Sequence, residues 1–458
     1  MTTMEASCDD RYGNGLLHKW TDAKESWCDA PDDSDTAGSL ECYPYLQEHK
    51  RIDGRGADIF CEAKNIFIDF SKVRACLSNS IQFVPYRYHK FAPGSTFSTC
   101  QKTSKYGKTK FMNHNQLQMS HFSAGRPAPT QGSYTVVDTP TYLLARDEDC
   151  ENSFHSTADF MNMYLVMNIL GLTAEEMQVI LFDSHADGPY IDLIRKAFSP
   201  NHPVLRAAAY KSSTVLFKRV VFHLESPAGV IFPRVANPDP MRCVNTALFD
   251  GYRRSILQAF DLLDISPPPI PSVVLSLRHR TATKNVGRVM ANEEEVVNVL
   301  KEGNMMNYRV VDTATMSYYE QLKMIRSANV LVGVHGAGLM FIMFAADEAV
   351  LVEIHPTYRQ DRHFRHASRV TGKNYMPLRA QQRETCKGSS DNVMVPINEF
   401  RATLDGAIRL ARGFDDGLSE CGLKCDPSIL ALDRRLDPHY ASTGTTKGRA
   451  VNTVFPCH

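Results

Sequence analysis

Short apolar runs alternate with amphipathic stretches between residues 272 and 378, and this alternation restricts the fold more than any other feature of the sequence. The runs at 272–277, 329–334 and 349–354 ("SVVLSL", "NVLVGV" and "AVLVEI") are typical of buried strands. The intervening segments have helical spacing, and Ser317 with Glu320 forms a capping box ahead of one of them. Strands that alternate with helices predict a mostly parallel sheet, and therefore an α/β fold.

The same alternation occurs earlier in the chain. Strands are predicted within 61–73, 136–145 and 177–183, and helices within 151–172, closed by Gly171, and 188–200. Four prolines in the segment 263–273 favour a stiff connector between two domains. The predicted organisation is an irregular, cysteine-containing segment at 1–55, Rossmann-like domains at 56–265 and 266–395, a helix at 396–414 and a loose tail at 415–458. A long excursion with little regular structure is expected at 86–135.

Charge and cysteine content limit the classes of partner and compartment. Lys and Arg number 51 against 51 Asp and Glu, so no basic field indicates a nucleic-acid partner. Twelve cysteines with no repeated C-x-x-C pair favour disulfides in an oxidising lumen over a zinc ribbon. The N-terminus has no signal-peptide pattern, and no stretch of the sequence is long and apolar enough to span a membrane. The alternatives are a cytosolic protein and a chain with a truncated start.

The run 328–344, "ANVLVGVHGAGLMFIMF", is interrupted by a histidine and two glycines where a strand should lead into a helix. Ligands of open α/β sheets collect at this position, near unpaired backbone N–H groups. Gly336 and Gly338 would let the backbone approach a phosphate, through close contact and positive φ, and His335 could donate a hydrogen bond to it. No G-x-G-x-x-G or P-loop pattern supports a dinucleotide or ATP site. The alternative is a tight turn with a packed histidine.

Two further groups fall at the ends of predicted strands. Arg278, His279 and Arg280 follow the strand 272–277, and Arg288 comes shortly after, so guanidinium groups could bind a pyrophosphate there. Glu353 ends the strand 349–354, where a carboxylate could hold a ribose or a base. The alternative for the arginines is a solvated basic loop.

The segment 146–160, "RDEDCENSFHSTADF", is the second candidate region. His155 and Asp159 are four residues apart on a predicted helix and would share one face, as an acid–base pair does. Asn152 precedes that helix and would either cap it or point into a cleft. The alternative is a core histidine fixed by an aspartate.

The blocks at 145–160, 278–296 and 318–354 together resemble glycosyltransferase family 61. The resemblance covers residues 136–380 and implies a GT-B fold, in which two Rossmann-like domains face a cleft, and an inverting transfer from a UDP-sugar. By position, Arg280 and Arg288 fall on the family's arginines, His335, Gly336 and Gly338 on its H-G-A-G-L motif, and Asn152, His155 and Asp159 on its N-x-x-H-x-x-x-D motif. We expect the donor to be bound by Arg280, Arg288, His335, Glu353 and the backbone N–H groups of Gly336, Ala337, Gly338 and Leu339. We expect His155 or Asp159 to be the catalytic base and Asn152 to contact the substrate. Met340 stands where the family usually has Thr or Ser.

The resemblance implies an enzyme that moves xylose or GlcNAc from a UDP-sugar donor to a glycan or glycoprotein acceptor in the Golgi or endoplasmic reticulum lumen. The spacing of the arginines favours a xylosyltransferase-like member. No metal ion or other cofactor is expected, because the loop at 335–339 and the arginines could neutralise the diphosphate. Two alternatives have weaker support: a catalytically inactive scaffold that binds a glycan or a partner protein, and a nucleotide-dependent oxidoreductase.

Overall fold

A computed structural model describes most of the chain. The described residues are 3–32, 34, 36–45, 58–78, 86–107, 122–146, 150–210, 212–226, 228–232, 243–279, 287–303, 307–356, 362–381 and 392–413. The chain forms two compact units, Met1–Leu263 and Asp264–His458, and the division falls in the proline-rich segment. Within the described ranges, no helix has the length and apolar character needed to cross a membrane.

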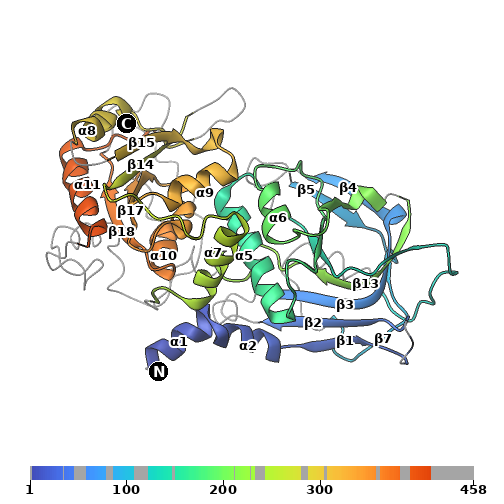
Figure 1. Cartoon of the computed structure of the whole chain (residues 1–458). Coiled ribbons are helices and arrows are strands. Elements are labelled where there is room, and N and C mark those ends of the chain that lie inside the picture. The colour runs from blue at the N-terminus through green and yellow to red at the C-terminus, as the bar shows by residue number, and fades with distance from the viewer. Residues whose placement is uncertain are drawn as a thin grey trace, which may run out of the picture. The chain divides into compact units, whose positions relative to one another are not determined.

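The unit Asp264–His458 is built on a parallel sheet of five strands in the order β15-β14-β16-β17-β18. The strands are β14 (Ser272–Leu277), β15 (Asn307–Asp312), β16 (Val330–Val334), β17 (Val350–His355) and β18 (Asn374–Arg379). The helices are α8 (Glu293–Glu302), α9 (Tyr318–Arg326), α10 (His363–Val370), α11 (Ile397–Ala411) and the 3₁₀ helices η4 (Thr313–Thr315) and η5 (Ala337–Phe344). Helices α8 and α11 cover one face of the sheet, and α9 and α10 cover the other (Figure 1). The sheet is therefore doubly wound, as its continuous apolar strands predict.

The core of this unit forms where α8 and α11 pack on the sheet. Val296 of α8 and Phe400 and Leu404 of α11 are buried against Val332 and Val352 of the central strands. Buried branched side chains on both partners stabilise the contact through the hydrophobic effect, at roughly 1.5–3 kcal/mol for each fully buried side chain. This packing fixes the central strands, whose carboxyl ends position the candidate site.

The unit Met1–Leu263 contains a mixed sheet. Its main path runs β12-β11-β10-β13-β3-β2-β1-β7, with β6, β8 and β9 attached at the side. Strands β12 (Leu205–Arg206), β11 (Gln178–Leu181), β10 (Thr141–Leu144), β13 (Thr214–Phe222) and β9 (Thr135–Val137) pair in parallel. The antiparallel part consists of β3 (Asp58–Asp69), β2 (Ser39–Tyr45), β1 (Glu25–Asp29), β7 (Gln101–Lys102) and β6 (Thr96–Phe97), and β8 (Phe122–Ser123) pairs with β6 in parallel.

The remaining elements of this unit lie around the sheet. They are α1 (Thr3–Tyr12), α2 (Asn14–Asp22), α5 (Ser153–Leu170), α6 (Ile191–Ala197), α7 (Ala247–Ala259), the 3₁₀ helices η1 (Phe70–Lys72) and η2 (Ala207–Tyr210), and the hairpin β4 (Val73–Ser78) and β5 (Tyr86–Phe91). Helix α5 begins after Asn152, whose side chain accepts a hydrogen bond from the Phe154 N–H at 3.0 Å. It ends at Gly171, which adopts φ 62°. This left-handed C-cap is the conformation that glycine favours.

The α/β class and most of the helices and strands predicted in residues 136–414 are confirmed. The prediction of an irregular segment at 1–55 is wrong, because α1, α2, β1 and β2 occupy most of its described residues. The sheet of the first unit is not the parallel sheet that a Rossmann-like domain implies, since β13, β3, β2 and β1 run antiparallel. The segment 86–135 holds only short strands in its described part, and residues 108–121 and the predicted tail at 415–458 lie outside the described residues.

Three disulfides explain why sequence periodicity failed at the N-terminus. Cys8 of α1 bonds to Cys243 just ahead of α7, Cys28 of β1 bonds to Cys100, and Cys42 bonds to Cys61. Cys42 and Cys61 are directly opposite each other on β2 and β3. Order in this segment comes from covalent and cross-strand contacts with distant residues, which local patterns do not record. The disulfides confirm the predicted framework and indicate folding in an oxidising compartment.

Candidate functional site

The strand order of the second unit creates a switch point between β14 and β16. The chain moves from β14 to β15 on one side and then crosses to β16 on the other, which is the 2-1-3-4-5 order of doubly wound sheets. Arg278 is the first residue after β14, and His335 is the first after β16. Ligands of open α/β sheets bind beyond the carboxyl ends of strands at such a point. The topology therefore places Arg278 and His335 where a ligand is expected.

Gly336 makes room for the guanidinium group of Arg278. A Cβ atom built on Gly336 would lie 1.7 Å from Nη1 of Arg278, so any other residue would have to displace that group. The backbone of Gly336 is extended, with φ 173°, and Gly338 is not among the residues with positive φ. Neither glycine therefore uses the positive φ that was expected to be available to it. Gly336 is required for the close approach of Arg278.

The turn after His335 leads into the 3₁₀ helix η5 and not into the predicted α-helix. The Leu339 N–H donates to the Gly336 carbonyl oxygen at 2.9 Å, so this N–H is used within the turn. Gly338 lies against Thr313, because a Cβ atom there would be 3.3 Å from Thr313 Oγ1. Met340 is only 1% exposed. Its side chain belongs to the core, so the substitution of the family's usual Thr or Ser does not place a methionine side chain at the surface of the site.

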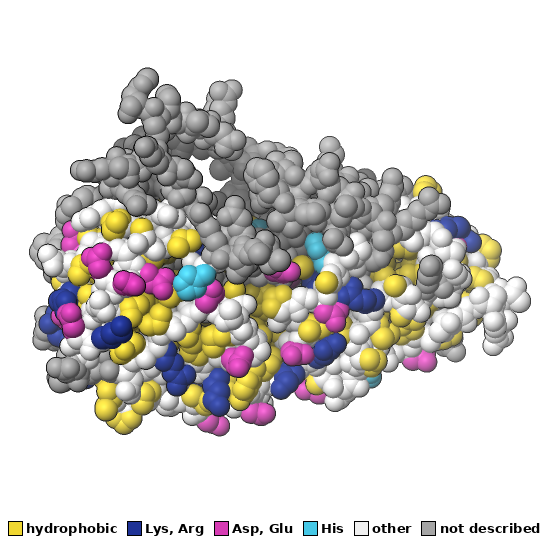
Figure 2. Space-filling view, turned by 90° about the horizontal axis from the view of Figure 1, so that it is seen from above, with side chains coloured by type: hydrophobic (Ala, Val, Ile, Leu, Met, Phe, Trp, Pro, Cys, Tyr) yellow, Lys and Arg dark blue, Asp and Glu magenta, His cyan; other side chains and the backbone are white. Residues whose placement is uncertain are grey.

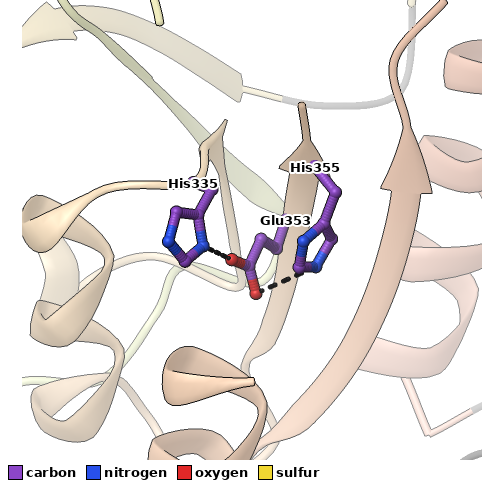
Figure 3. Close-up of side chains that lie close together, drawn as sticks. All are labelled: His335, Glu353 and His355. Atoms are coloured by element: carbon purple, nitrogen blue, oxygen red, sulfur yellow. Dashed lines mark hydrogen bonds and ion pairs between the residues drawn. The ribbon is translucent and has the colours of Figure 1, made fainter. Parts of the chain in front are cut away.

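The Nδ1 atom of His335 is hydrogen-bonded to a buried carboxylate. This atom lies 2.5 Å from Glu353 Oε1, and the hydroxyl of Tyr375 donates to Glu353 Oε2 at 2.8 Å. Nε2 of His355 lies 2.7 Å from the Tyr375 hydroxyl and 3.4 Å from Glu353 Oε2. Figure 3 shows the Glu353 side chain between the two histidine rings. Glu353 is 0% exposed, so the geometry gives no support to a direct contact between this carboxylate and a ribose.

The charge of Glu353 follows from its neighbours. Burial alone raises the pKa of the Glu353 carboxyl group, but the nearby His355 and the hydrogen bonds from His335 and His355 outweigh it and hold the pKa well below its usual range. Glu353 is therefore an ionised carboxylate. Because a carboxylate only accepts hydrogen bonds, His335 donates from Nδ1.

Three side chains of this cluster could also hold a metal ion. One ligand atom each of His335, Glu353 and His355 lie within 4.8 Å of one another. The separation of 2.5 Å between His335 Nδ1 and Glu353 Oε1 is shorter than the roughly 3.4 Å expected between two atoms bound to one tetrahedral zinc ion. It matches a charge-assisted hydrogen bond. The arrangement thus favours a hydrogen-bonded cluster over a coordination site.

His279 lies at the rim of the same strand ends. Its ring nitrogens lie 3.1 Å from Glu293 Oε2 and 3.2 Å from Asp312 Oδ2, and its side chain is 46% exposed. The hydrogen bond with Glu293 raises the pKa of His279; burial opposes this, and the charges of Glu293 and Asp312 add to the increase. Arg288 follows with φ 63°, a left-handed conformation that is uncommon outside glycine. Arg280 lies outside the described residues.

The candidate residues of the first unit separate into two environments. Asp159 is buried, and its Oδ1 atom lies 3.3 Å from Nε2 of His223, whose Nδ1 atom lies 2.9 Å from the Tyr142 hydroxyl. Burial lowers the pKa of His223 to about 3, so its ring is neutral. His155 is half-buried and packs edge-on against Phe232. The structure therefore binds Asp159 into a core network, whereas His155 keeps a partly exposed ring. Asn152 caps α5, the first of its two predicted alternatives.

A buried ion pair joins the carboxyl ends of β10 and β11 in the first unit. Arg146 follows β10 and donates to both carboxylate oxygens of Asp183, which follows β11, at 2.7 and 2.9 Å. No sequence pattern predicted a role for His223, Arg146, Asp183, His355 or Tyr375. Arg146, Asp183 and His355 are polar residues at the carboxyl end of a predicted strand, Tyr375 lies near the start of one, and His223 follows β13, which was not predicted. A place at the end of a predicted strand is the only sequence pattern that could have identified the first three.

On the face seen in Figure 2, basic and acidic side chains of the described residues are interspersed and do not gather into one basic patch. This distribution agrees with the balanced composition of 51 basic and 51 acidic residues. Long-range attraction of a polyanion requires a patch or stripe of one sign. The visible described surface has none.

Fold and site define a doubly wound α/β protein with an arginine and a carboxylate-supported histidine at its switch point. Residues 153–352 match the family model of Glycosyltransferase 61. The match supports the resemblance to glycosyltransferase family 61 that the sequence motifs predicted. The matched range contains His155, Asp159, Arg278 and His335, and it ends one residue before Glu353.

The similar curated proteins are EGF domain-specific O-linked N-acetylglucosamine transferases. The chain is 24% identical to the Canis lupus familiaris protein over 75% of its own length and 63% of the relative. It is 26% identical to the Drosophila melanogaster protein over 69% of its length and 59% of the relative. It thus spans less than two thirds of these relatives. TibC, an iron-containing glycosyltransferase of enterotoxigenic E. coli H10407, aligns with 89% of this chain and 98% of its own at 10% identity, with a TM-score of 0.26, which is too low to support any argument.

Proposed function

We propose that the protein is a glycosyltransferase that moves a sugar from a UDP-sugar to a glycan or glycoprotein acceptor. The observation that carries this proposal is the contact of Arg278 with Gly336, beside His335, at the switch point of the parallel sheet. Glycosyl transfer leaves a nucleoside diphosphate, and its developing negative charge is stabilised by fixed donors and cations. A guanidinium group and an imidazole at the ends of adjacent strands supply both.

In this mechanism Arg278 and His335 bind the diphosphate, and the hydrogen-bond donors of the turn at Gly336–Gly338 orient it. Arg288 belongs to the same proposed donor site, together with Arg280. These groups can neutralise a leaving diphosphate without a metal ion, and we propose that none is required. The negative charge of the diphosphate is neutralised by two or three cationic side chains. In a site of low dielectric, each of these interactions is stronger than in water.

A general base must deprotonate the acceptor hydroxyl group. His155 is the better candidate of the two predicted residues, because its ring is partly exposed, whereas Asp159 is buried and bound to His223. We assign Asp159 the role of fixing the interior of α5 against β13. A partly exposed imidazole can exchange protons with an acceptor near neutral pH.

The proposal also covers the identity of the donor sugar and the compartment in which the protein works. The names of the similar proteins favour GlcNAc as the transferred sugar over the xylose that the arginine spacing suggested. Three disulfides support a lumenal location, in the Golgi or endoplasmic reticulum. UDP-GlcNAc and UDP-xylose share the nucleotide part that the switch point would bind. A comparison of the two donors therefore tests the sugar independently of the nucleotide.

The first experiment measures thermal unfolding with UDP, GDP, NAD or no ligand. UDP at a hundred times its Kd should stabilise the folded state by about 2.7 kcal/mol. His335→Ala, Arg278→Ala and Arg288→Ala should each reduce that stabilisation, whereas Arg409→Ala, on the exposed side of α11, should retain it. A folded protein that does not respond to UDP would rule out the transferase.

Turnover separates the enzyme from an inactive scaffold. Mass spectrometry of UDP-GlcNAc and UDP-xylose incubated with the protein and candidate glycoprotein acceptors should show UDP release and a mass increase on the acceptor. His155→Gln should lower the rate more than it lowers donor affinity. UDP binding without release from either donor sugar would favour the scaffold.

A further inference from the structure

The residues behind His335 come from three adjacent strands and meet on one face of the sheet. His335 follows β16, Glu353 and His355 lie two residues apart on β17, and Tyr375 lies on β18. Residues two apart on a strand point to the same face, so the backbone itself brings Glu353 and His355 together. The backbone N–H of His335 also donates to the Ile354 carbonyl oxygen at 2.9 Å, and this bond fixes the start of the turn against β17.

The hydrogen bonds of this cluster have one consistent direction. The ionised Glu353 can only accept, so Oε1 accepts from His335 Nδ1–H and Oε2 accepts from the Tyr375 hydroxyl. The single hydroxyl hydrogen of Tyr375 is then used, so His355 must donate to that hydroxyl from Nε2. His355 to Tyr375 to Glu353 is thus a chain of donors that ends on the carboxylate.

We propose that Glu353, supported by Tyr375 and His355, is the positioning residue that keeps the proton of His335 on Nδ1 and directs Nε2 toward the donor diphosphate. The other ring nitrogen of an imidazole points away from the one that is hydrogen-bonded. A histidine whose Nδ1 is held by a carboxylate has its tautomer and ring orientation fixed. This inference rests on the proposed function for the identity of the ligand, but the tautomer can be measured in the free protein.

Proton uptake follows from this arrangement. A diphosphate beside Nε2 favours a proton on that nitrogen, and the Glu353 carboxylate stabilises the resulting imidazolium from the other side. His335 would then donate from both nitrogens, to Glu353 and to the diphosphate. UDP binding should therefore be accompanied by the uptake of a proton from solvent.

The first arm of the test is ligand-free and uses protein labelled with ¹⁵N in its histidine rings. The wild type should show His335, assigned by loss of its signals in His335→Gln, as the Nδ1–H tautomer. Glu353→Gln should populate the other tautomer, because a carboxamide can also donate. Tyr142→Phe is the matched control, since it removes another buried hydroxyl hydrogen-bonded to a histidine. An Nε2–H tautomer in the wild type would overturn the proposal.

The second arm measures UDP binding by calorimetry in buffers of different ionisation enthalpy. Glu353→Gln should lose the proton uptake and bind UDP about 10- to 100-fold more weakly, as expected for a lost hydrogen bond to a charged group. Tyr375→Phe keeps the carboxylate and should weaken binding about threefold, so it provides the answer where Glu353→Gln does not fold.

Wild-type proton uptake in a folded Glu353→Gln protein would overturn the positioning role. Failure of the wild type to bind UDP would overturn the proposed function, and the first arm would still decide the tautomer.

Discussion

Gly336 is the residue at which the candidate site tolerates least change. A methyl group there would overlap Nη1 of Arg278, whereas one on Gly338 would approach only Thr313 Oγ1, at 3.3 Å. Gly336→Ala should therefore displace the guanidinium group and weaken UDP binding about tenfold, the effect of one lost charge-assisted hydrogen bond. Because the guanidinium is the end of a flexible side chain, thermal stability should change little. Calorimetric titration with UDP measures the affinity, and a smaller loss in Gly338→Ala is the control. Equal losses would contradict the role of Arg278.

His223 should make the folded state sensitive to acid. Burial lowers its pKa to about 3 from the value of 6.5 in the unfolded chain. Between these two pH values the unfolded state binds a proton that the folded state does not, so stability falls as the pH falls. The slope from this group is about 1.4 kcal/mol per pH unit. No loss from His223 is expected above pH 6.5.

Urea unfolding between pH 7 and pH 4.5 measures this dependence. His223→Gln removes the titrating ring, so its stability should fall less steeply with acid than that of the wild type. His18→Gln, which replaces an exposed histidine of α2, controls for the loss of any histidine. Identical slopes for wild type and His223→Gln would show that the ring is protonated in the folded protein.

Some site residues could be predicted from sequence, and others could not. His335 stood out because it interrupts an apolar run at the end of a strand. The sequence did not show that Arg278 lies against Gly336, because that contact depends on the pairing of β14 with β16. The partner of Asp159 lies 64 residues away, just after the end of β13, and the pairing of β13 with β10 brings His223 to α5. Glu353 was identified for its position, but its contact with His335 depends on the register of β16 and β17.

Helix α9 is the element whose local design is clearest. The Ser317 side chain accepts from the Glu320 N–H at 3.3 Å, and the Glu320 carboxylate accepts from the Ser317 N–H at 2.7 Å. Ser317→Ala removes one half of this capping box and should lower the free energy of unfolding by about 1 kcal/mol. Denaturant unfolding measures the loss. Ser327→Ala, at the other end of α9, is the control and should cost less, since its hydroxyl bonds only to carbonyls of its own last turn.

Elements were predictable where local sequence decides them. Strands β14, β16 and β17 are buried on both faces, so each is a mostly apolar run, interrupted on β17 by Glu353 and His355. The cap of α5 and the capping box of α9 depend on neighbours within four residues. By contrast, β1 and β2 are short and only partly buried, without a regular alternation, and they gain order from β3 and two disulfides. The 3₁₀ geometry of η5 was not predictable from its uniformly apolar composition.

At the scale of the whole molecule, the covalent links and the candidate donor site fall in different units. All three disulfides that the structure describes lie within Met1–Leu263. Arg278, His335 and Glu353 lie within Asp264–His458. Each unit has a core of its own, around β3 and β13 in one and around β16 and β17 in the other. A reductant should therefore destabilise the first unit, whereas a nucleotide should stabilise the second.

Hydrogen exchange with mass spectrometry tests this separation. Breaking the disulfides should reduce protection of β1, β2 and β3, since closing loops of 19 to 235 residues contributes on the order of 3–5 kcal/mol per bond in the chain-entropy account. UDP should increase protection of β14, β16 and η5, because a ligand that binds only the folded state suppresses opening around its site. The double variant Cys42→Ser with Cys61→Ser should reproduce the loss locally around β2 and β3 and leave the UDP response intact. If reductant removed protection equally from β16 and β17, the two units would unfold as one cooperative block, and the disulfides would stabilise the donor site as well.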